Sequence, residues 1–166
     1  KVDKLVDKYL DEVISIRRHI HQNPELSLKE FETSKFVANE LRKIGLEAQE
    51  GVGKTGVVSN LNLGKGEKNL MLRADMDALP IQEETGLPFA SKNPGVMHAC
   101  GHDIHTSILL GVTKVLNEIK DEINGNVKFV FQPAEENVTG AKAVIAAGLM
   151  QKEPLNDIVV GLHTHP

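Results

Sequence analysis

Short apolar runs rich in β-branched residues alternate along this chain with longer segments of helical periodicity. This alternation constrains the fold more than any other feature. The runs that predict strands are residues 56–63, 69–76, 126–132 and 157–163. Their apolar character is typical of strands that are covered on both faces. The alternation predicts a three-layer α/β domain with a largely parallel or mixed central sheet flanked by helices.

Four segments carry the apolar spacing of amphipathic helices. Ser27 stands three residues before Glu30, which is the spacing of a capping box at a helix start. Gly45 follows the same segment and predicts a left-handed helix end. The predicted helices cover residues 2–20, about 30–44, 104–119 and 139–147.

Length and charge limit the classes of protein that the chain can represent. The 166 residues suit one domain with a real core, and no composition shift marks a boundary. The net charge is −4 with no long basic run, which argues against nucleic acid as a partner. One cysteine, no signal-like segment and no membrane-length apolar stretch favour a cytoplasmic protein that does not contact a membrane.

Polar clusters follow three of the predicted strands, at residues 74–80, 133–137 and 162–166. In open α/β sheets, ligands bind outside the carboxyl ends of the strands. We therefore expect these three clusters to converge in space. Residues 97–105 should join them from the loop before the third predicted helix.

Cys100 and His102 are the first candidates for metal ligands. They lie one residue apart in a loop with Ala99 and Gly101, where the backbone can aim both side chains at one point. A thiolate and an imidazole together suit zinc or a neighbouring transition metal. The alternative is a buried cysteine that acts as a small apolar residue, with unrelated histidines nearby.

Acidic pairs occupy the other two clusters. Glu135 and Glu136 are neighbours that point in different directions on a regular element, so one could hold a metal while the other faces a water. The alternative is a solvated acidic surface. Asp75 and Asp77 could cap a turn, or could accept the far N–H of a metal-bound imidazole. Both interpretations of each pair remain open.

The histidines elsewhere in the chain differ in how well they suit a role as metal ligands. His163 and His165 close the last predicted strand, and at least one of them is a credible ligand beside the thiol and the carboxylates. His19 and His21 lie near a helix end, where a structural role is favoured. Residues 51–56 end like a phosphate-binding loop but lack its first glycine and precede a strand.

Five blocks of the sequence together resemble the M20 metallopeptidase and amidohydrolase family. The resemblance is to its aminoacylase-like branch of N-acyl-amino-acid amidohydrolases, hippurate hydrolases and auxin-conjugate hydrolases. The blocks are RRHIHQNPELS, LRADMDALPI, MHACGHDIHTSILLG, FQPAEE and GLHTHP, in family order. The resemblance implies that residues 1–166 are the amino-terminal portion of a hydrolase catalytic domain, without the lid and dimerisation domain.

The resemblance also implies site roles, which we state as expectations. Two divalent metals, zinc or manganese first and cobalt or nickel as alternatives, would be bridged by Cys100. Glu135 would be the general base, and Asp77 would support the metals, with Asp75 standing where more distant relatives place a histidine. The further ligands would be His102, Glu136 and His163, with His163 favoured over His165.

The implied activity is hydrolysis of the amide bond of N-acyl amino acids or short peptide-like amides by a hydroxide generated at the metals. The full-length protein would be a homodimer. Three alternatives remain: a carboxypeptidase or dipeptidase of the same family, a metal-free hydrolase with Cys100 as nucleophile, and an inactive or truncated metal-binding module.

Overall fold

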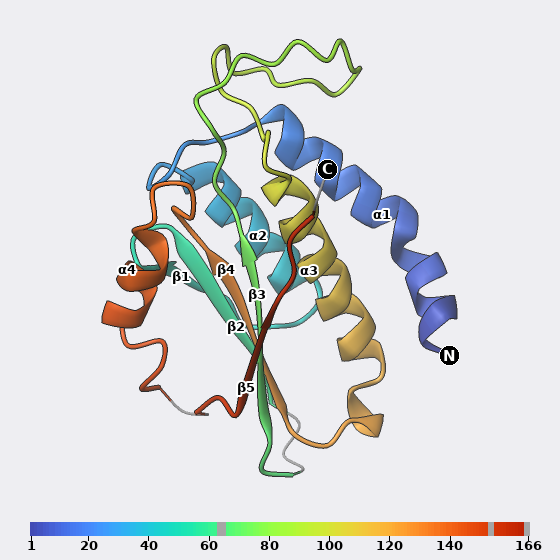
Figure 1. Cartoon of the computed structure of the whole chain (residues 1–166). Helices are drawn as coiled ribbons and strands as arrows, with labels where there is room; N and C mark the ends of the chain where they lie inside the picture. The colour runs from blue at the N-terminus through green and yellow to red at the C-terminus, as the bar shows by residue number, and fades with distance from the viewer. Residues whose placement is uncertain (63–65, 153–154, 165–166) are drawn as a thin grey trace.

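A five-stranded sheet lies at the centre of the structure, which is a computed structural model that describes residues 1–62, 66–152 and 155–164 (Figure 1). The helices are α1 (Val2–Gln22), α2 (Phe31–Lys43), α3 (His102–Glu118) and α4 (Gly140–Ala146), with a short 3-10 helix at Lys120–Glu122. The strands are β1 (Gln49–Val52), β2 (Gly56–Asn62), β3 (Asn69–Asp75), β4 (Asn126–Gln132) and β5 (Ile158–Gly161). The predicted strands and helices are all present, and β1 is an additional strand.

The sheet is mixed, with the strand order β1-β2-β4-β3-β5. β3 runs parallel to both β4 and β5, whereas β2 runs antiparallel to β1 and β4. Connection length explains the difference, because a parallel pair needs a crossover of about a dozen or more residues. Only residues 63–68 link β2 to β3, so these two strands run in opposite directions, and β2 is antiparallel to β4, which lies between them. The longer connections that contain α3 and α4 allow β3, β4 and β5 to run parallel.

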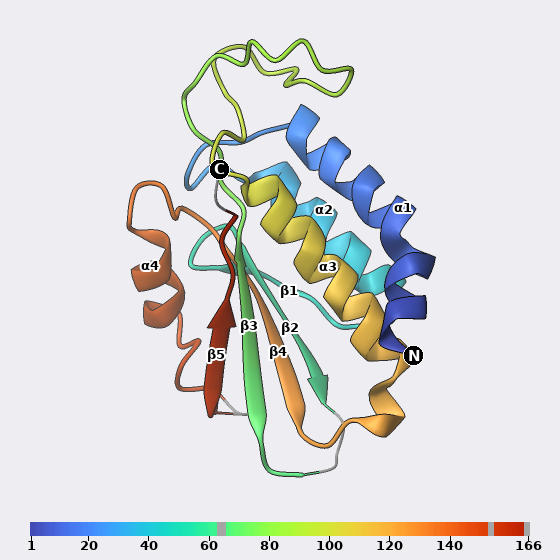
Figure 2. The same ribbon diagram turned by 45° about the vertical axis from the view of Figure 1, so that its right-hand side comes forward.

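Helices cover the two faces of the sheet unequally. Figure 2 shows α1, α2 and α3 on one side of the sheet and α4 on the other. Alternate residues of β4 enter the two cores: Phe129 and Phe131 pack with α2 and α3, while Val130 packs with Val144 of α4. This period-two alternation is why β4 reads as a continuous apolar run.

Helix ends follow the sequence signals in part. Gly45 has φ 88° and ends the turn after α2, and Gly148 does the same after α4 with φ 89°. The capping-box prediction is wrong, because Glu30 is the N-cap of α2 and no side-chain cap bond forms there. Ser27 and Glu30 instead bond to segments distant in sequence. No helix among the described residues is long and apolar enough to cross a bilayer.

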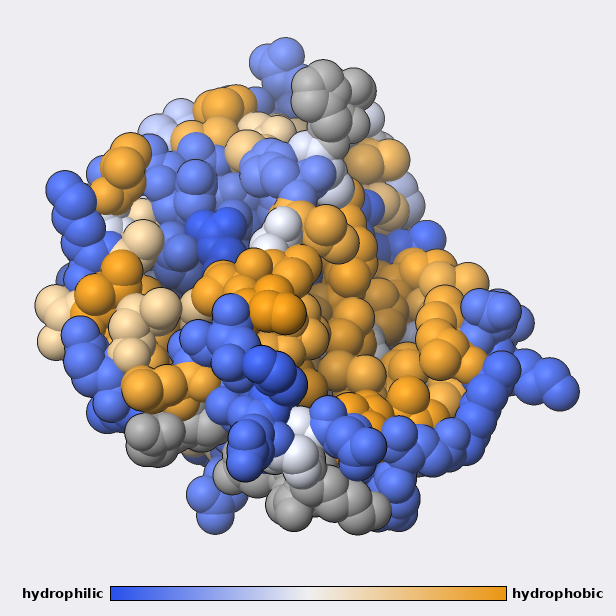
Figure 3. Space-filling view, turned by 60° about the horizontal axis from the view of Figure 1, so that its bottom comes forward, coloured by the Kyte–Doolittle hydropathy of each residue, from blue (hydrophilic) through white to orange (hydrophobic). Residues whose placement is uncertain are grey.

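β5 forms one end of the sheet and leaves its apolar side chains accessible. Ile158, Val159 and Val160 are 58%, 51% and 39% exposed. A hollow beside β5 continues over α3 to a groove between α1 and α3. Ile108 and Val112 line both the hollow and the groove. Figure 3 shows apolar side chains gathered around a hollowed part of this surface. We call β5 and this groove the apolar face.

Candidate functional site

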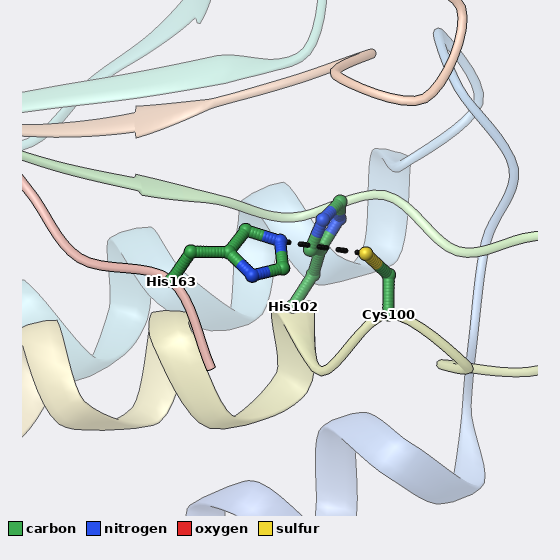
Figure 4. Close-up of side chains that lie close together, drawn as sticks. All are labelled: Cys100, His102 and His163. Carbon is green, nitrogen blue, oxygen red and sulfur yellow. Dashed lines mark hydrogen bonds between the residues drawn. The ribbon is translucent and has the colours of Figure 1, made fainter. Parts of the chain in front are cut away.

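The predicted site residues meet at the carboxyl ends of the three parallel strands. Asp75 at the end of β3 pairs in register with Gln132 at the end of β4, and Arg73 pairs with Gly161 of β5. The three polar clusters therefore leave the sheet at one edge, as predicted. The amino-terminal end of α3 brings Cys100 and His102 to the same edge (Figure 4).

His102 lies at the centre of the site and is fully buried. Its Nδ1 donates a hydrogen bond to the backbone carbonyl of Asp77 at 2.8 Å. In a neutral ring the other nitrogen, Nε2, then carries a lone pair. This Nε2 is buried and has no hydrogen-bond partner among the residues that the structure describes. An orphaned buried acceptor is costly, so it indicates a missing partner such as a cation.

His163, which follows β5, is oriented in the same way as His102. Its Nδ1 lies 2.5 Å from the carbonyl oxygen of Thr164, which can only accept a hydrogen bond. Its Nε2 therefore faces the Sγ of Cys100, 3.4 Å away (Figure 4). Two imidazoles thus have their Nδ1 atoms fixed by carbonyls and their Nε2 atoms turned inward. His165 lies outside the described residues.

Cys100 is not poised as a free nucleophile. Burial and the negative charge of Glu136 raise the pKa of its thiol to about 11. A thiol that stays protonated near neutral pH is a poor nucleophile. The prediction of a metal-free cysteine hydrolase therefore loses its main chemical support. A cation would reverse this effect, because coordination favours the thiolate.

Glu135 and Glu136 approach the same atom. Glu135 Oε2 and Glu136 Oε1 each lie 3.8 Å from His102 Nε2. Strand alternation does not separate them, because the chain leaves β4 at Ala134 with φ 51° and enters a turn. Burial distinguishes them instead: the side chain of Glu136 is 18% exposed and that of Glu135 is 40% exposed. Burial also raises the pKa of Glu136.

Asp77 organises the turn that carries both glutamates. Its carboxylate accepts the backbone N–H groups of Glu135 and Glu136, each at 3.0 Å, and the hydroxyl of Ser27 at 2.6 Å. Burial alone would raise the pKa of Asp77. The hydrogen bonds from His102, Ser27 and the two amides outweigh burial and lower this pKa to about 2. Asp77 is therefore ionised under all ordinary conditions.

Asp75 sits on the opposite side of His102. Its Oδ2 lies 3.6 Å from His102 Nε2, and its carboxylate also bonds to Arg73 and His105 at 2.7 and 2.6 Å. Asp75 and Asp77 thus flank the two nitrogens of one buried ring. The charge at this edge is strongly acidic, because four carboxylates surround a single imidazole.

Several residues with contacts at the site carried no clear sequence signal. Glu30 is fully buried and accepts the backbone N–H of Ala134 at 2.8 Å and the hydroxyl of Thr55 at 2.6 Å. Ser27 bonds to Asp77 rather than to the start of α2. His105 contacts Thr164, beside His163. The sequence signal at Glu30 was the capping-box spacing with Ser27, which predicted a different role.

His19 and His21, for which a structural role was predicted, lie outside the cluster. His19 stacks on Phe36 with ring centroids 4.3 Å apart. His21 is buried between Asp103 and Glu83, with its ring nitrogens 2.8 and 3.1 Å from their oxygens. The bond to Asp103 raises the pKa of His21, although burial opposes the increase. Residues 51–56 cover the end of β1, the turn that follows it and the first residue of β2, and do not form a phosphate loop before a helix.

The donor set fits a cation. Three groups of side chains have ligand atoms within 4.8 Å of one another, and His102 belongs to all three. The groups are Cys100, His102 and His163; Asp75, His102 and His105; and His102, Glu135 and Glu136. Within the described part of the chain, the buried Nε2 of His102 and Oε1 of Glu136 have no hydrogen-bond partner. Excess negative charge, inward lone pairs and orphaned buried atoms together match a site for divalent metal.

Comparison with known proteins identifies the family. Residues 71–166, more than half of the chain, match the model of peptidase family M20/M25/M40. The chain belongs to this family. The resemblance predicted from the five sequence blocks is therefore confirmed.

Relatives of this M20-family chain include enzymes named for two related reactions. It is 51% identical over 168 aligned positions to thermostable carboxypeptidase 2 of Saccharolobus solfataricus, covering 98% of this chain and 42% of that protein. It is 45% identical over 164 positions to an N-acyl-L-amino acid amidohydrolase of Geobacillus stearothermophilus, covering 98% of this chain and 44% of that one.

A solved structure of the M20 family shares the fold. The crystal structure of a dinuclear metal-binding peptidase from Bacillus subtilis superposes with a TM-score of 0.90 at 41% identity, covering 96% of this chain and 44% of that one. The fold class predicted from the sequence is confirmed. The chain spans less than half of the length of the relatives that it matches.

Proposed function

We propose that this chain supplies a two-metal centre that hydrolyses the amide bond of N-acyl amino acids or short peptide-like amides. One observation carries the proposal: the buried Nε2 of His102 and Oε1 of Glu136 have no hydrogen-bond partner within residues 1–62, 66–152 and 155–164, and these two atoms lie 3.8 Å apart. Cys100 and His163 complete an inward-facing donor set beside them. The dinuclear metal centre named for the Bacillus subtilis relative supports two ions.

We propose that Cys100, His102, Glu136 and His163 would hold the two ions. The sulfur, nitrogen and oxygen donors are compatible with zinc or manganese, and with cobalt or nickel as alternatives. The hydrogen bonds of His102 and His163 through Nδ1 support this assignment, because they leave Nε2 available for coordination.

Glu135 is the general base in this proposal. When bound, the two ions would lower the pKa of water and polarise the amide carbonyl. Glu135 would take a proton from the attacking water onto its carboxylate and deliver it to the departing amine nitrogen. Its greater exposure relative to Glu136 suits a group that meets substrate. Asp77 holds both glutamates through their backbone amides and so fixes the distance between base and ligand.

The carboxypeptidase relative supports a second candidate within the same chemistry. A carboxypeptidase cleaves the amide before a free carboxylate, and an N-acyl amino acid is the smallest substrate of that form. Both relatives match this chain over 98% of its length. Turnover of N-acetyl amino acids without cleavage of longer peptides would favour the amidohydrolase, and the reverse would favour the carboxypeptidase.

The proposal extends to the organisation of the whole protein. We propose that residues 1–166 are the amino-terminal portion of the catalytic domain of a cytoplasmic protein. The lid and dimerisation domain would lie elsewhere in the full-length protein, which would be a homodimer. Coverage of 42% and 44% of the two relatives supports this organisation. The lone Cys100 thiol suits a reducing compartment.

Glu135→Gln in the full-length protein tests the mechanism. We expect kcat for N-acetyl amino acids to fall by about 10²–10⁴-fold, because the general base is removed, while the bound metal measured by elemental analysis is unchanged. Glu84→Gln, at an exposed site in the loop after β3, is the matched control and should retain full activity.

Two outcomes would contradict the proposal. Retained metal with near wild-type kcat in Glu135→Gln would remove Glu135 from the mechanism. Bound metal without turnover in the wild-type full-length protein would favour the inactive metal-binding module instead.

A further inference from the structure

Thr164 connects His163 to the rest of the site. Its carbonyl accepts the Nδ1 proton of His163, its backbone N–H donates to His105 Nε2 at 2.9 Å, and its hydroxyl lies 3.4 Å from the carbonyl of Cys100. The position of Thr164 therefore fixes the ring of His163. β5 ends at Gly161, so no sheet hydrogen bond performs this task at residue 164.

His105 holds the Thr164 peptide from the first turn of α3. Its side chain is buried, and its Nδ1 lies 2.6 Å from Asp75 Oδ1. Because an ionised carboxylate can only accept, Nδ1 carries the proton. Nε2 is then the acceptor that the N–H of Thr164 requires. Arg73 bonds to the other oxygen of Asp75 at 2.7 Å and fixes the start of this chain of bonds.

We propose that His105 is a positioning residue for His163. It acts through Thr164: the hydrogen bond to Asp75 sets the tautomer of His105, and His105 Nε2 accepts the N–H of Thr164 and so holds the residue whose carbonyl orients His163. The inference rests on the proposed metal centre, in which His163 is a ligand. The spacing supports it, because His102 and His105 are three residues apart on one helix face. The rings of His105 and His163 also pack edge-on with centroids 4.6 Å apart.

Two amide variants separate the bonds that His105 makes. The side-chain amide of His105→Gln reaches the position of Nε2, so its oxygen can accept the N–H of Thr164. The shorter His105→Asn reaches only the position of Nδ1, so it can bond to Asp75 but not to Thr164. Both variants keep a neutral polar side chain in the same buried place. Circular dichroism of both checks that the fold is retained.

Cobalt binding to the full-length protein provides the readout. We expect His105→Asn to weaken the binding of one Co²⁺ by about 10–100-fold, as is typical when a group that orients a ligand is lost, and to change the visible absorption of that ion. His105→Gln should stay within about threefold of wild type. Equal affinities for Asn and wild type, or equal losses for Asn and Gln, would overturn the inference.

A second background distinguishes positioning from a general structural role. If His105 acts through His163, His105→Asn should cause no further loss of Co²⁺ affinity when His163 is already alanine. The same loss in both backgrounds would overturn the inference while leaving the metal centre intact. A wild-type protein that takes up no Co²⁺ would overturn the proposed function and this inference with it.

Discussion

Individual polar residues at this site make hydrogen bonds that their local sequence context does not predict. Ser27 and Glu30 have the spacing of a capping box, yet Ser27 bonds to Asp77 and Glu30 accepts the N–H of Ala134. The same donors and acceptors serve either role. Tertiary contacts decided between them, because buried backbone groups next to the glutamates needed partners. No pattern within residues 27–30 could have predicted this outcome.

The ligand candidates themselves were predictable from the sequence. These candidates follow predicted strands or lie at the start of a predicted helix: Cys100, His102, Glu135, Glu136 and His163. Parallel strands bring their carboxyl ends to one edge of the sheet, so the candidates were expected to lie together. The hydrogen bonds that orient these side chains were not predictable. They depend on which turns meet in space, as the contact between Thr164 and His105 illustrates.

A buried histidine makes a pH-dependent contribution to stability. Burial lowers the pKa of His98 to about 4, and neither ring nitrogen has a hydrogen-bond partner among the described residues. In the unfolded chain this residue binds a proton near pH 6.5. The contribution of neutral His98 to the free energy of unfolding is therefore fully present above that pH and is lost as the pH falls toward 4. We expect this residue alone to cost about 2 kcal/mol of unfolding free energy between pH 7 and pH 4.5.

The measurement compares wild-type protein with His98→Phe by urea unfolding in chelator at the two pH values. The variant removes the titrating group while keeping a ring, so its loss of stability on acidification should be smaller by that amount. Carboxylates titrate alike in both proteins and cancel. An identical pH dependence for the two proteins would show that His98 stays hydrated in the fold.

At the scale of elements, the sequence predicted the helices and the apolar strands but not β1. The four residues Gln49–Val52 are mostly exposed, and only Val52 is buried. A polar edge strand lacks the alternation on which strand prediction depends. The apolar pattern alone also could not predict the strand directions. The short link after β2 reverses the chain before β3, and because β3 is parallel to β4, β2 is antiparallel to β4.

The start of α3 depends on a glycine. Gly101 has φ 87°, and a Cβ there would lie 2.5 Å from Thr164 Oγ1. Gly101→Ala should therefore cost about 1–2 kcal/mol in backbone strain and also displace Thr164. Because the Thr164 carbonyl orients His163, we expect Co²⁺ affinity to fall by about tenfold or more. Thermal unfolding and Co²⁺ titration measure the two effects.

Gly95→Ala is the matched control for that substitution. Gly95 has a similar φ of 75°, but nothing lies within 4 Å of its added Cβ. It should show the loss of stability without the loss of Co²⁺ affinity. Equal Co²⁺ affinities for the two variants would mean that Thr164 can move without disturbing His163.

At the scale of the whole molecule, the apolar face sets the solution behaviour of the 166-residue chain. Val159 is 51% exposed on β5, and among the described strands β5 pairs only with β3. An exposed, apolar edge strand is a template for pairing between chains. We therefore expect this chain to self-associate as its concentration rises, as measured by size-exclusion chromatography with light scattering.

Val159→Lys should reduce this self-association, because a charge on an edge strand opposes pairing. Ile145→Lys is the control, since Ile145 is 47% exposed on α4 rather than on β5. It should leave self-association unchanged. A chain that stays monomeric at high concentration, or an equal effect of both substitutions, would show that the edge of β5 is not the contact.

The position of β5 in the strand order also bears on biosynthesis. A ribosome makes the segments carrying Cys100, His102 and Glu136 before it makes His163, yet β5 pairs with β3, an early segment near the middle of the sheet. If these residues hold the cations as we propose, a nascent chain has only part of the donor set until β5 docks against β3. Metal loading would then depend on that docking, and the order of synthesis would protect the newly made polypeptide from capturing a cation with an incomplete set of ligands.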